Sequence, residues 1–350
     1  MTIDAKETNV IRAAVAGLGW WGKTIVNRLE DSDRIAVKAV VEPDPAPHAE
    51  FAGQRGLVLV TSLDEIWADP EIDAVILCTP HGVHAEQVRA AAAHGKHVFC
   101  EKPLALSRAD AERSVEACRQ AGVVLGIGHE RRFETAMAEL RRLVAEGELG
   151  TIMHVEANFN HNKLANVPKG DWRRSPKEAP AAGMTAMGIH LTDALISLLG
   201  PVDTVYAATA SRVSGYETGD VVSALMRFKE GATGYINAVL VTPLYLRFTV
   251  FGSKAWVEFR NETHPDTPGP SQLTFYPAEG EPVTRVYEWN DSVRANLEAF
   301  ADAIETGAPY PFTDIEKVAN ISVLEGIARS VDSGQAVSCD PVREVSGAAE

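Results

Sequence analysis

The stretch IRAAVAGLGWWG, residues 11–22, decides the fold of this chain. Its first six residues are small or β-branched, as in a buried strand, and they lead directly into a G-x-G-x-x-G motif. In that motif Gly17 permits a tight turn, Gly19 lets the backbone approach a pyrophosphate, and Gly22 allows a helix to pack closely on the strand. The stretch therefore predicts the first strand–turn–helix unit of a dinucleotide-binding fold, with phosphates at the helix N-terminus.

An acidic residue follows the motif at the spacing that this fold requires. The second predicted strand, 36–41, ends beside Glu42, about twenty residues downstream. A carboxylate at this point accepts the hydroxyl groups of the adenosine ribose and repels a 2′-phosphate. Since Pro43 and Asp44 supply no arginine, NAD is favoured over NADP. The alternative without a ligand is a glycine turn beside a solvated carboxylate.

The rest of the first 130 residues alternates between short apolar runs and amphipathic stretches, which is the pattern of a parallel α/β sheet. This region is predicted to be an NAD-binding Rossmann domain covering 1–130. Further strands are expected at 74–78, 97–100 and 123–127, and helices at 22–29, 63–67, 85–94 and 108–121.

From residue 131 the pattern changes, and a second α/β domain is predicted over 131–350. Its candidate strands are mostly consecutive in sequence, which favours a mostly antiparallel sheet. The strands are expected at 153–160, 204–209, 221–228, 234–241, 247–251 and 255–259, and the helices at 132–145, 184–199, 293–304 and 315–331.

The composition excludes several classes of function. A formal net charge of -15 and a pI near 5.2 disfavour nucleic acid and anionic membrane surfaces as partners. The polar first ten residues predict neither a signal peptide nor a membrane span, so a cytoplasmic protein is expected. The four cysteines form no C-x-x-C pair, and the histidines between 81 and 97 lack a pattern of carboxylates or thiols that would complete a metal site.

Two of the predicted parallel strands end in residues suited to a ligand crevice, which lies at the carboxyl ends of such strands. Thr79-Pro80 follows strand 74–78 and can present a hydroxyl to the cofactor, although an ordinary strand end is the alternative. Glu101-Lys102-Pro103 follows strand 97–100. Lys102, beside a nicotinamide, can hydrogen-bond a substrate hydroxyl and lower its pKa, although an exposed charge is the alternative. His84 is a further candidate, or a solvated histidine at a helix start.

Together these motifs resemble the glucose-fructose oxidoreductase, inositol dehydrogenase and MocA (Gfo/Idh/MocA) family, over nearly the whole chain. Glu101-Lys102-Pro103 combined with Gly188-x-His190-x-x-Asp193 carries the resemblance most specifically. The segment 128–133 is similar to the family's connection between domains. Trp172-Arg173 and Gly183 are similar to its substrate domain.

The resemblance implies a Rossmann domain joined to an α/β domain with an open sheet. It also implies reversible hydride transfer between NAD(P) and a sugar, a cyclic polyol or a related carbonyl compound, in a homodimer or homotetramer assembled through that sheet. Lys102 corresponds to the catalytic lysine and His190 to the general base. The expected cofactor-binding residues are Gly17, Gly19, Trp20, Trp21, Gly22, Glu42, Thr79, Pro80, His84, Glu101 and Lys102.

One position departs from the family pattern. Where the family usually has an aspartate four residues before the histidine, this chain has Ala186. Three explanations are open: His190 acts without a carboxylate, Asp193 substitutes for it, or the substrate needs less polar contact. Asp193 can also simply stabilise its helix.

The candidate substrate contacts come mostly from the second domain, and each has a structural alternative. Arg132 and Arg173 can instead form surface salt bridges, Asn158 can belong to a hydrophilic strand end, and His190 can be a buried histidine satisfied by backbone. The full expected set is Lys102, Arg132, Asn158, Arg173, His190 and Asp193.

Three functions remain open. The first is a dehydrogenase or reductase. The second is an NAD-assisted hydrolase or lyase that oxidises its substrate transiently and regenerates the cofactor. The third is a non-catalytic NAD-sensing regulator, against which the presence of both Lys102 and His190 argues.

Overall fold

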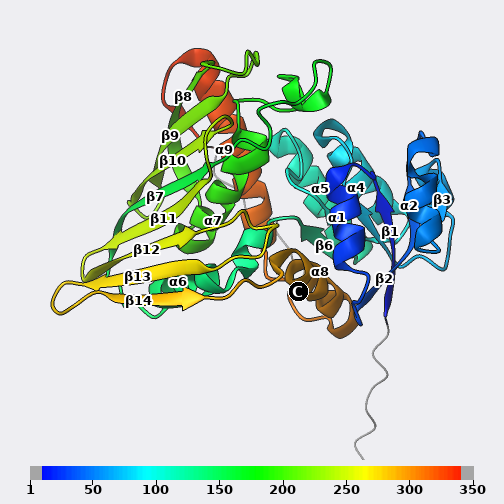
Figure 1. Cartoon of the computed structure of the whole chain (residues 1–350), viewed down its shortest axis with the longest axis horizontal. Helices are drawn as coiled ribbons and strands as arrows, with labels where there is room; N and C mark the ends of the chain where they lie inside the picture. Colours follow the sequence, from blue (N-terminus) through cyan, green and yellow to red (C-terminus); the bar gives the residue numbers. More distant parts are fainter. Residues whose placement is uncertain (1–9, 340–350) are drawn as a thin grey trace, which may run out of the picture. The chain divides into compact units, whose positions relative to one another are not determined.

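The computed structural model describes residues 10–339 and divides into two compact units (Figure 1). In the described part of the chain, the N-terminal unit consists of residues 10–104 together with Glu112–Gly128 and Val293–Thr313. The C-terminal unit consists of Ala105–Ala111, His129–Ser292 and residues 314–339. In the part of the chain described, no helix combines the length and apolar content needed to cross a membrane.

The N-terminal unit contains a six-stranded, fully parallel sheet, which confirms the predicted Rossmann fold. The strand order is β3-β2-β1-β4-β5-β6, so the chain changes direction across the sheet between β1 and β4. At such a switch point the loops after the two strands diverge and leave a crevice for a ligand. The strands are β1 (Ile11–Ala16), β2 (Ile35–Val41), β3 (Val58–Val60), β4 (Ala74–Leu77), β5 (His97–Cys100) and β6 (Leu125–Ile127).

The helices of this unit lie close to their predicted positions: α1 (Trp20–Arg28), α3 (Leu63–Trp67), α4 (His84–Ala93) and α5 (Arg108–Ala121). The short helix α2 (Ala49–Gln54) and strand β3 were not predicted. Both are brief, and β3 buries none of its three residues fully, so neither carries a clear apolar periodicity.

The core of the N-terminal unit is completed by helix α8 (Ser292–Thr306), far along the sequence. Its apolar residues Val293, Leu297 and Phe300 belong to the same buried cluster as the residues of β1. A Cβ atom at Gly126 would lie 2.6 Å from the ring of Phe99 and 2.8 Å from that of Phe300, so a side chain there would prevent this packing. The predicted boundary, with all of 131–350 in one domain, therefore differs from the structure, because 293–313 packs with the first sheet.

The C-terminal unit contains a nine-stranded sheet in the order β14-β13-β12-β11-β7-β10-β9-β8-β15. Neighbouring strands pair antiparallel except β7 and β10, which are parallel, so the prediction of a mostly antiparallel sheet is confirmed. The strands are β7 (Ile152–Asn160), β8 (Val202–Ala210), β9 (Val221–Phe228), β10 (Thr233–Val239), β11 (Tyr245–Gly252), β12 (Ala255–Asn261), β13 (Ser271–Pro277), β14 (Val283–Tyr287) and β15 (Val337–Ser338).

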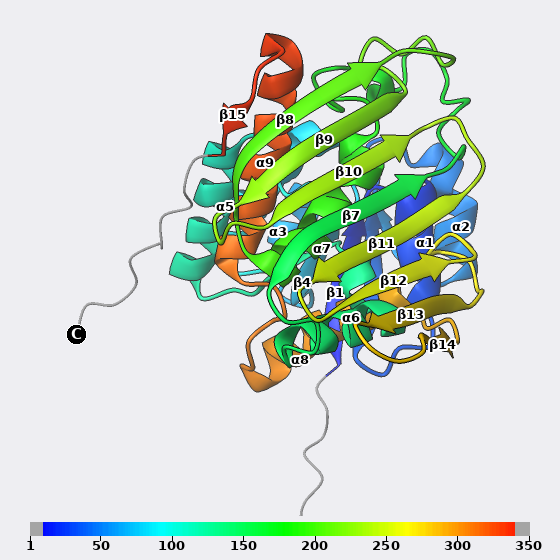
Figure 2. The same ribbon diagram turned by 90° about the vertical axis from the view of Figure 1, so that its left-hand side faces the viewer.

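One face of this sheet carries the helices α6 (Thr135–Ala145), α7 (Ile189–Leu199) and α9 (Asp314–Ser333). Figure 2 looks onto the opposite face, across which the ribbons of the strands run in front of these helices. The two faces are visible in the alternation along β9, where Ala224 and Met226 are buried while Leu225 between them is 55% exposed.

Two predicted helices of the C-terminal unit begin differently from expectation. The helix expected over 184–199 starts with a π-helical turn, Met184–Gly188, before α7, and the alanines at 181 and 182 just before it have φ angles of 56° and 55°. The helix expected over 132–145 is a 3₁₀ turn, Glu130–Phe133, followed by α6, because Glu134 between them is extended. The 3₁₀ turn carries Arg132, and the π-helical turn leads directly into the first turn of α7, which carries His190.

Candidate active site

The glycine turn after β1 needs two of its glycines for backbone packing. A Cβ at Gly17, where φ is +91°, would lie 2.6 Å from the carbonyl oxygen of Cys78, and one at Gly22 would lie 1.8 Å from that of Gly17. A Cβ at Gly19, by contrast, would meet nothing within 4 Å. The turn thus leaves an open approach to its backbone at Gly19, as a bound pyrophosphate requires.

Helix α1 begins at this opening without a side-chain cap. Gly19 is its N-cap residue and makes no side-chain hydrogen bond, and the first turn carries no acidic residue. The backbone N–H groups of that turn and the helix dipole therefore favour an anion. Trp20, 59% exposed, and Trp21 flank the opening, with ring centroids 5.2 Å apart. These features fit a dinucleotide phosphate.

Glu42 lies beside the glycine turn. Its Oε1 accepts a hydrogen bond from the backbone N–H of Leu18, and His48 Nε2 lies 4.0 Å from the same oxygen. The carboxylate is thereby fixed at the carboxyl end of β2, the position expected for a ribose-binding acid.

His84 joins the loops that follow β4 and β5. Its side chain is fully buried, with Nε2 2.9 Å from the carbonyl oxygen of Thr79 and Nδ1 2.7 Å from that of Pro103. The alternative of a solvated histidine is therefore wrong. The Thr79 hydroxyl donates to Gln87 Oε1. His84 thus holds together the backbone of the two loops that carry Thr79-Pro80 and Lys102.

Glu101 is buried behind the half-buried Lys102. Its Oε2 accepts the backbone N–H of Lys102 at 3.2 Å, and a Cβ at Gly128 would lie only 2.5 Å from its carboxyl group. Burial raises the pKa of Glu101 from 4.5 to about 7, although the indole of Trp21 and the charge of Lys102 oppose the rise. A residue next to the candidate catalytic lysine thus titrates near neutral pH.

The free energy of unfolding of a Glu101→Gln variant is expected to depend less on pH than that of the wild type. Because the folded protein binds this proton more tightly than the unfolded chain, wild-type stability contains a contribution that is complete below pH 4.5 and lost as the pH rises through 7. The loss amounts to about 3 kcal/mol. Urea unfolding at several pH values across this window should show that the free energy of unfolding changes less with pH in Glu101→Gln than in the wild type. Equal pH dependence in the two proteins would refute the raised pKa of Glu101.

In the C-terminal unit, His190 lies in the first turn of α7 and is 4% exposed. Its Nδ1 is 3.7 Å from Oε2 of the buried Glu130. The ring of His129 meets it edge-on at 5.4 Å between centroids, and the ring of Phe159 lies 6.1 Å away. The candidate base therefore sits among two aromatic rings and one carboxylate.

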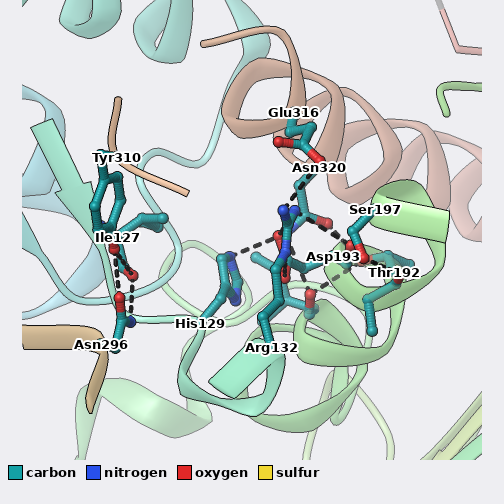
Figure 3. Close-up of polar contacts among 12 residues, drawn as sticks. Ile127, His129, Arg132, Thr192, Asp193, Ser197, Asn296, Tyr310, Glu316 and Asn320 are labelled. Carbon is teal, nitrogen blue, oxygen red and sulfur yellow. Dashed lines mark hydrogen bonds and ion pairs between the residues drawn. The ribbon is translucent and has the colours of Figure 1, made fainter. Parts of the chain in front are cut away.

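Arg132 and Asp193 contact each other (Figure 3). The guanidinium donates to both carboxylate oxygens, at 2.6 and 2.7 Å, and also contacts Glu316 on α9 at 3.0 Å. Burial alone would lower the pKa of Arg132, but the two carboxylates outweigh it and the pKa is raised. With Arg132 only 3% exposed, the alternative of a surface salt bridge is wrong, and the pair instead ties α7 to α9 and the 3₁₀ turn.

Asn320 on α9 contacts His129 (Figure 3). Its amide nitrogen lies 3.2 Å from the carbonyl oxygen of Ile189, which can only accept, so this atom is the donor. The same amide nitrogen is 3.0 Å from His129 Nε2. The amide oxygen of Asn320 accepts a hydrogen bond from the Thr192 hydroxyl at 2.6 Å. Nε2 of His129 is therefore an acceptor, and the ring proton is on Nδ1.

The other two expected substrate contacts have protein partners. Asn158 Oδ1 accepts from Arg247 Nε at 3.2 Å. Arg173 stacks on Trp172, 4.2 Å from the ring centroid, and pairs with Asp171 at 3.3 Å, as its surface salt-bridge alternative predicts. Trp172 also lines a hollow of about 440 Å³ in the C-terminal unit.

Sequence reasoning did not single out three residues that surround the candidate base: His129, Glu130 and Asn320. The first two lie within the segment 128–133, whose run of charged residues is a usable signal. Asn320 lies in a helix with ordinary amphipathic composition, and nothing in the sequence marks it.

Two family profiles match the chain, one in each unit. The profile of the "Oxidoreductase family, NAD-binding Rossmann fold" matches residues 11–129, and that of the "GFO/IDH/MocA C-terminal domain" matches 137–258. D-xylose 1-dehydrogenase (NADP(+)) 2 of Haloferax volcanii is 32% identical over 329 residues, covering 93% of this chain and 98% of its own. The scyllo-inositol 2-dehydrogenase (NAD(+)) of Bacillus subtilis is 27% identical, covering 96% and 98%.

Among solved structures, the aldose-aldose oxidoreductase from Caulobacter crescentus complexed with glycerol superposes with a TM-score of 0.84 at 26% identity, covering 94% of this chain and all of that one. The two family profiles and the full-length relatives account for both units. The chain therefore belongs to the Gfo/Idh/MocA family of oxidoreductases, with an NAD(P)-binding Rossmann domain at its N-terminus.

Proposed function

We propose that the protein transfers a hydride between NAD and a hydroxyl or carbonyl carbon of a sugar, a cyclic polyol or a related hydroxylated ring compound. The observation that carries the proposal is the edge of the parallel sheet at β1, β4 and β5. These three strands are neighbours, so the glycine turn, Thr79 and Lys102 all follow strand ends on one edge. An open anion site and a lysine at the same edge are what a nicotinamide-dependent enzyme needs.

Each residue then has a chemical role. When bound, the nicotinamide accepts or returns the hydride. The ammonium group of Lys102 hydrogen-bonds the substrate oxygen and stabilises negative charge developing on it, and the imidazole of His190 takes the hydroxyl proton. The Gly19 backbone and the start of α1 hold the pyrophosphate, and Glu42 holds the adenosine ribose.

A screen of sugars, inositols and other hydroxylated rings for NAD reduction at 340 nm tests this function. An oxidoreductase forms NADH in proportion to substrate consumed. Substrate consumption without net NADH would instead indicate an NAD-assisted hydrolase or lyase, and cofactor binding without any turnover across the screen would indicate a regulator.

The cofactor preference is expected to depend on Glu42. Relatives named for NADP and for NAD both occur, so the preference has to come from this chain's own residues. Glu42 should repel a 2′-phosphate, and the wild-type protein should bind NAD more tightly than NADP. Dissociation constants for both cofactors, measured by calorimetry, should converge in Glu42→Ala, while tighter NADP binding by the wild type would contradict the proposal.

A homodimer or homotetramer assembled through the face shown in Figure 2 also remains our proposal. Tyr206 and Leu225, 45% and 55% exposed, lie opposite each other on the paired strands β8 and β9, and a partner subunit would bury them. Sedimentation analysis giving only a monomer at micromolar concentration would rule it out.

A further inference from the structure

The candidate base His190 has a carboxylate neighbour that the sequence did not indicate. Family resemblance predicts an aspartate at position 186, where this chain has alanine, and that position lies in the π-helical turn before α7. The remaining acid on α7 near the base, Asp193, has both oxygens occupied by Arg132 at 2.6 and 2.7 Å. The carboxylate aimed at His190 comes instead from the 3₁₀ turn, at Glu130.

Glu130 and His190 are both buried, at 7% and 4% exposure, and Glu130 Oε2 lies 3.7 Å from His190 Nδ1. This separation is that of an ion pair and slightly longer than a hydrogen bond, and contacts of this kind commonly shorten when substrate binds. We propose that Glu130 is the positioning residue of His190: its carboxylate keeps the imidazole as the Nδ1–H tautomer and leaves Nε2 to take the substrate proton. The inference rests on the proposed function.

The tautomer follows from the chemistry of the pair. An ionised carboxylate can only accept, so the ring nitrogen facing it must carry the proton, and the other nitrogen is then the basic one. In alcohol oxidation the hydroxyl proton moves to Nε2 while the carbon that bears this hydroxyl gives up a hydride, for which the oxidised cofactor of the proposed function would be the acceptor. The resulting imidazolium is stabilised by the carboxylate across a buried contact, where water screens charge poorly.

Other charged groups near His190 in the described part of the C-terminal unit have ion-pair partners of their own. Arg131 pairs with Glu134 at 2.9 Å and lies over the Phe159 ring. Arg132 is held between Asp193 and Glu316. On the far side of Phe159, His264 and Lys163 both contact Asp266.

His129, edge-on to His190, accepts from Asn320 through Nε2. A neutral ring in that state contributes little charge. Among the acids named, Glu130 is therefore the one whose charge acts directly on His190.

The test uses full-length protein with ¹⁵N-labelled histidine, in which the signal of His190 is assigned by its loss in His190→Ala. In the wild type the His190 signals should report the Nδ1–H tautomer, and in Glu130→Gln that preference should be lost.

The turnover of Glu130→Gln should fall roughly 10- to 100-fold with little change in KM. The pH giving half-maximal kcat/KM should move downward by about one pH unit, because a negative charge beside the base is gone. Glu130→Asp, which keeps the charge, should restore part of the turnover.

Glu134→Gln is the matched control. Glu134 is equally buried, lies four residues away and contacts Arg131 and Asn261 instead of His190. It should leave the tautomer and the pH profile unchanged.

If Glu130→Gln keeps the wild-type tautomer and pH profile while His190→Ala loses turnover by about 10²-fold or more, the role of Glu130 is overturned and the proposed function stands. If His190→Ala itself turns over normally, the role of His190 in the proposed function is overturned instead.

Discussion

A Lys102→Ala variant is expected to lose turnover by at least about 10³-fold while its affinity for NAD changes little. The lysine side chain acts on the substrate oxygen, where it stabilises charge that develops only in the transition state. The phosphate and ribose contacts that we assign to Gly19, α1 and Glu42 are left intact. NADH formation measures the first quantity and calorimetric titration with NAD measures the second.

Lys38→Ala provides the matched control, because Lys38 is an exposed lysine in the middle of β2. It should leave both quantities near their wild-type values. A Lys102→Ala enzyme with near-normal turnover would show that another group polarises the substrate, and one that no longer bound NAD would place Lys102 in the cofactor site instead.

An Arg132→Met variant is expected to lower the free energy of unfolding by about 3–5 kcal/mol. The substitution roughly keeps the volume of the side chain but leaves Asp193, 2% exposed, in the interior without its cation. Urea denaturation followed by circular dichroism measures the loss. The double variant Arg132→Met, Asp193→Leu removes both charges and should recover much of the stability, since replacing a buried pair by apolar side chains is often nearly neutral.

The exposed pair Arg227–Asp203 offers a comparison in the same unit. Its side chains are 61% and 37% exposed, so Arg227→Met should cost less than about 1 kcal/mol. If Arg132→Met lowers the free energy of unfolding as little as Arg227→Met does, then water or another group must stabilise the charge of Asp193.

The N-terminal unit could be predicted in detail because its decisive features are local in sequence. The steric demands at Gly17 and Gly22 arise between residues of one turn and the neighbouring strand, and Glu42 reaches that same turn from the end of the adjacent strand. Apolar runs bounded by turn residues fix where parallel strands begin and end. The structure therefore places these residues where the motif implies.

The C-terminal unit was harder to predict for equally physical reasons. Strand β14 has four exposed residues among its five, so it shows no alternation, and β15 has only two residues. The pairing of Arg132 with Asp193 joins residues 61 positions apart, and that of Glu130 with His190 a similar span. Such contacts depend on how α7 packs against the 3₁₀ turn, and no local sequence pattern encodes this packing.

Helix α8 has a consequence for how the chain folds as it leaves the ribosome. Domains usually fold in order of synthesis, each when its own residues have emerged. Here Phe300 covers Phe99 and Gly126, so the nucleotide-binding core stays incomplete until nearly 300 residues have been made, after the whole nine-stranded sheet except β15 has emerged. The two units thus mature almost together, and a fragment cut after Gly128 would leave an apolar groove where α8 belongs.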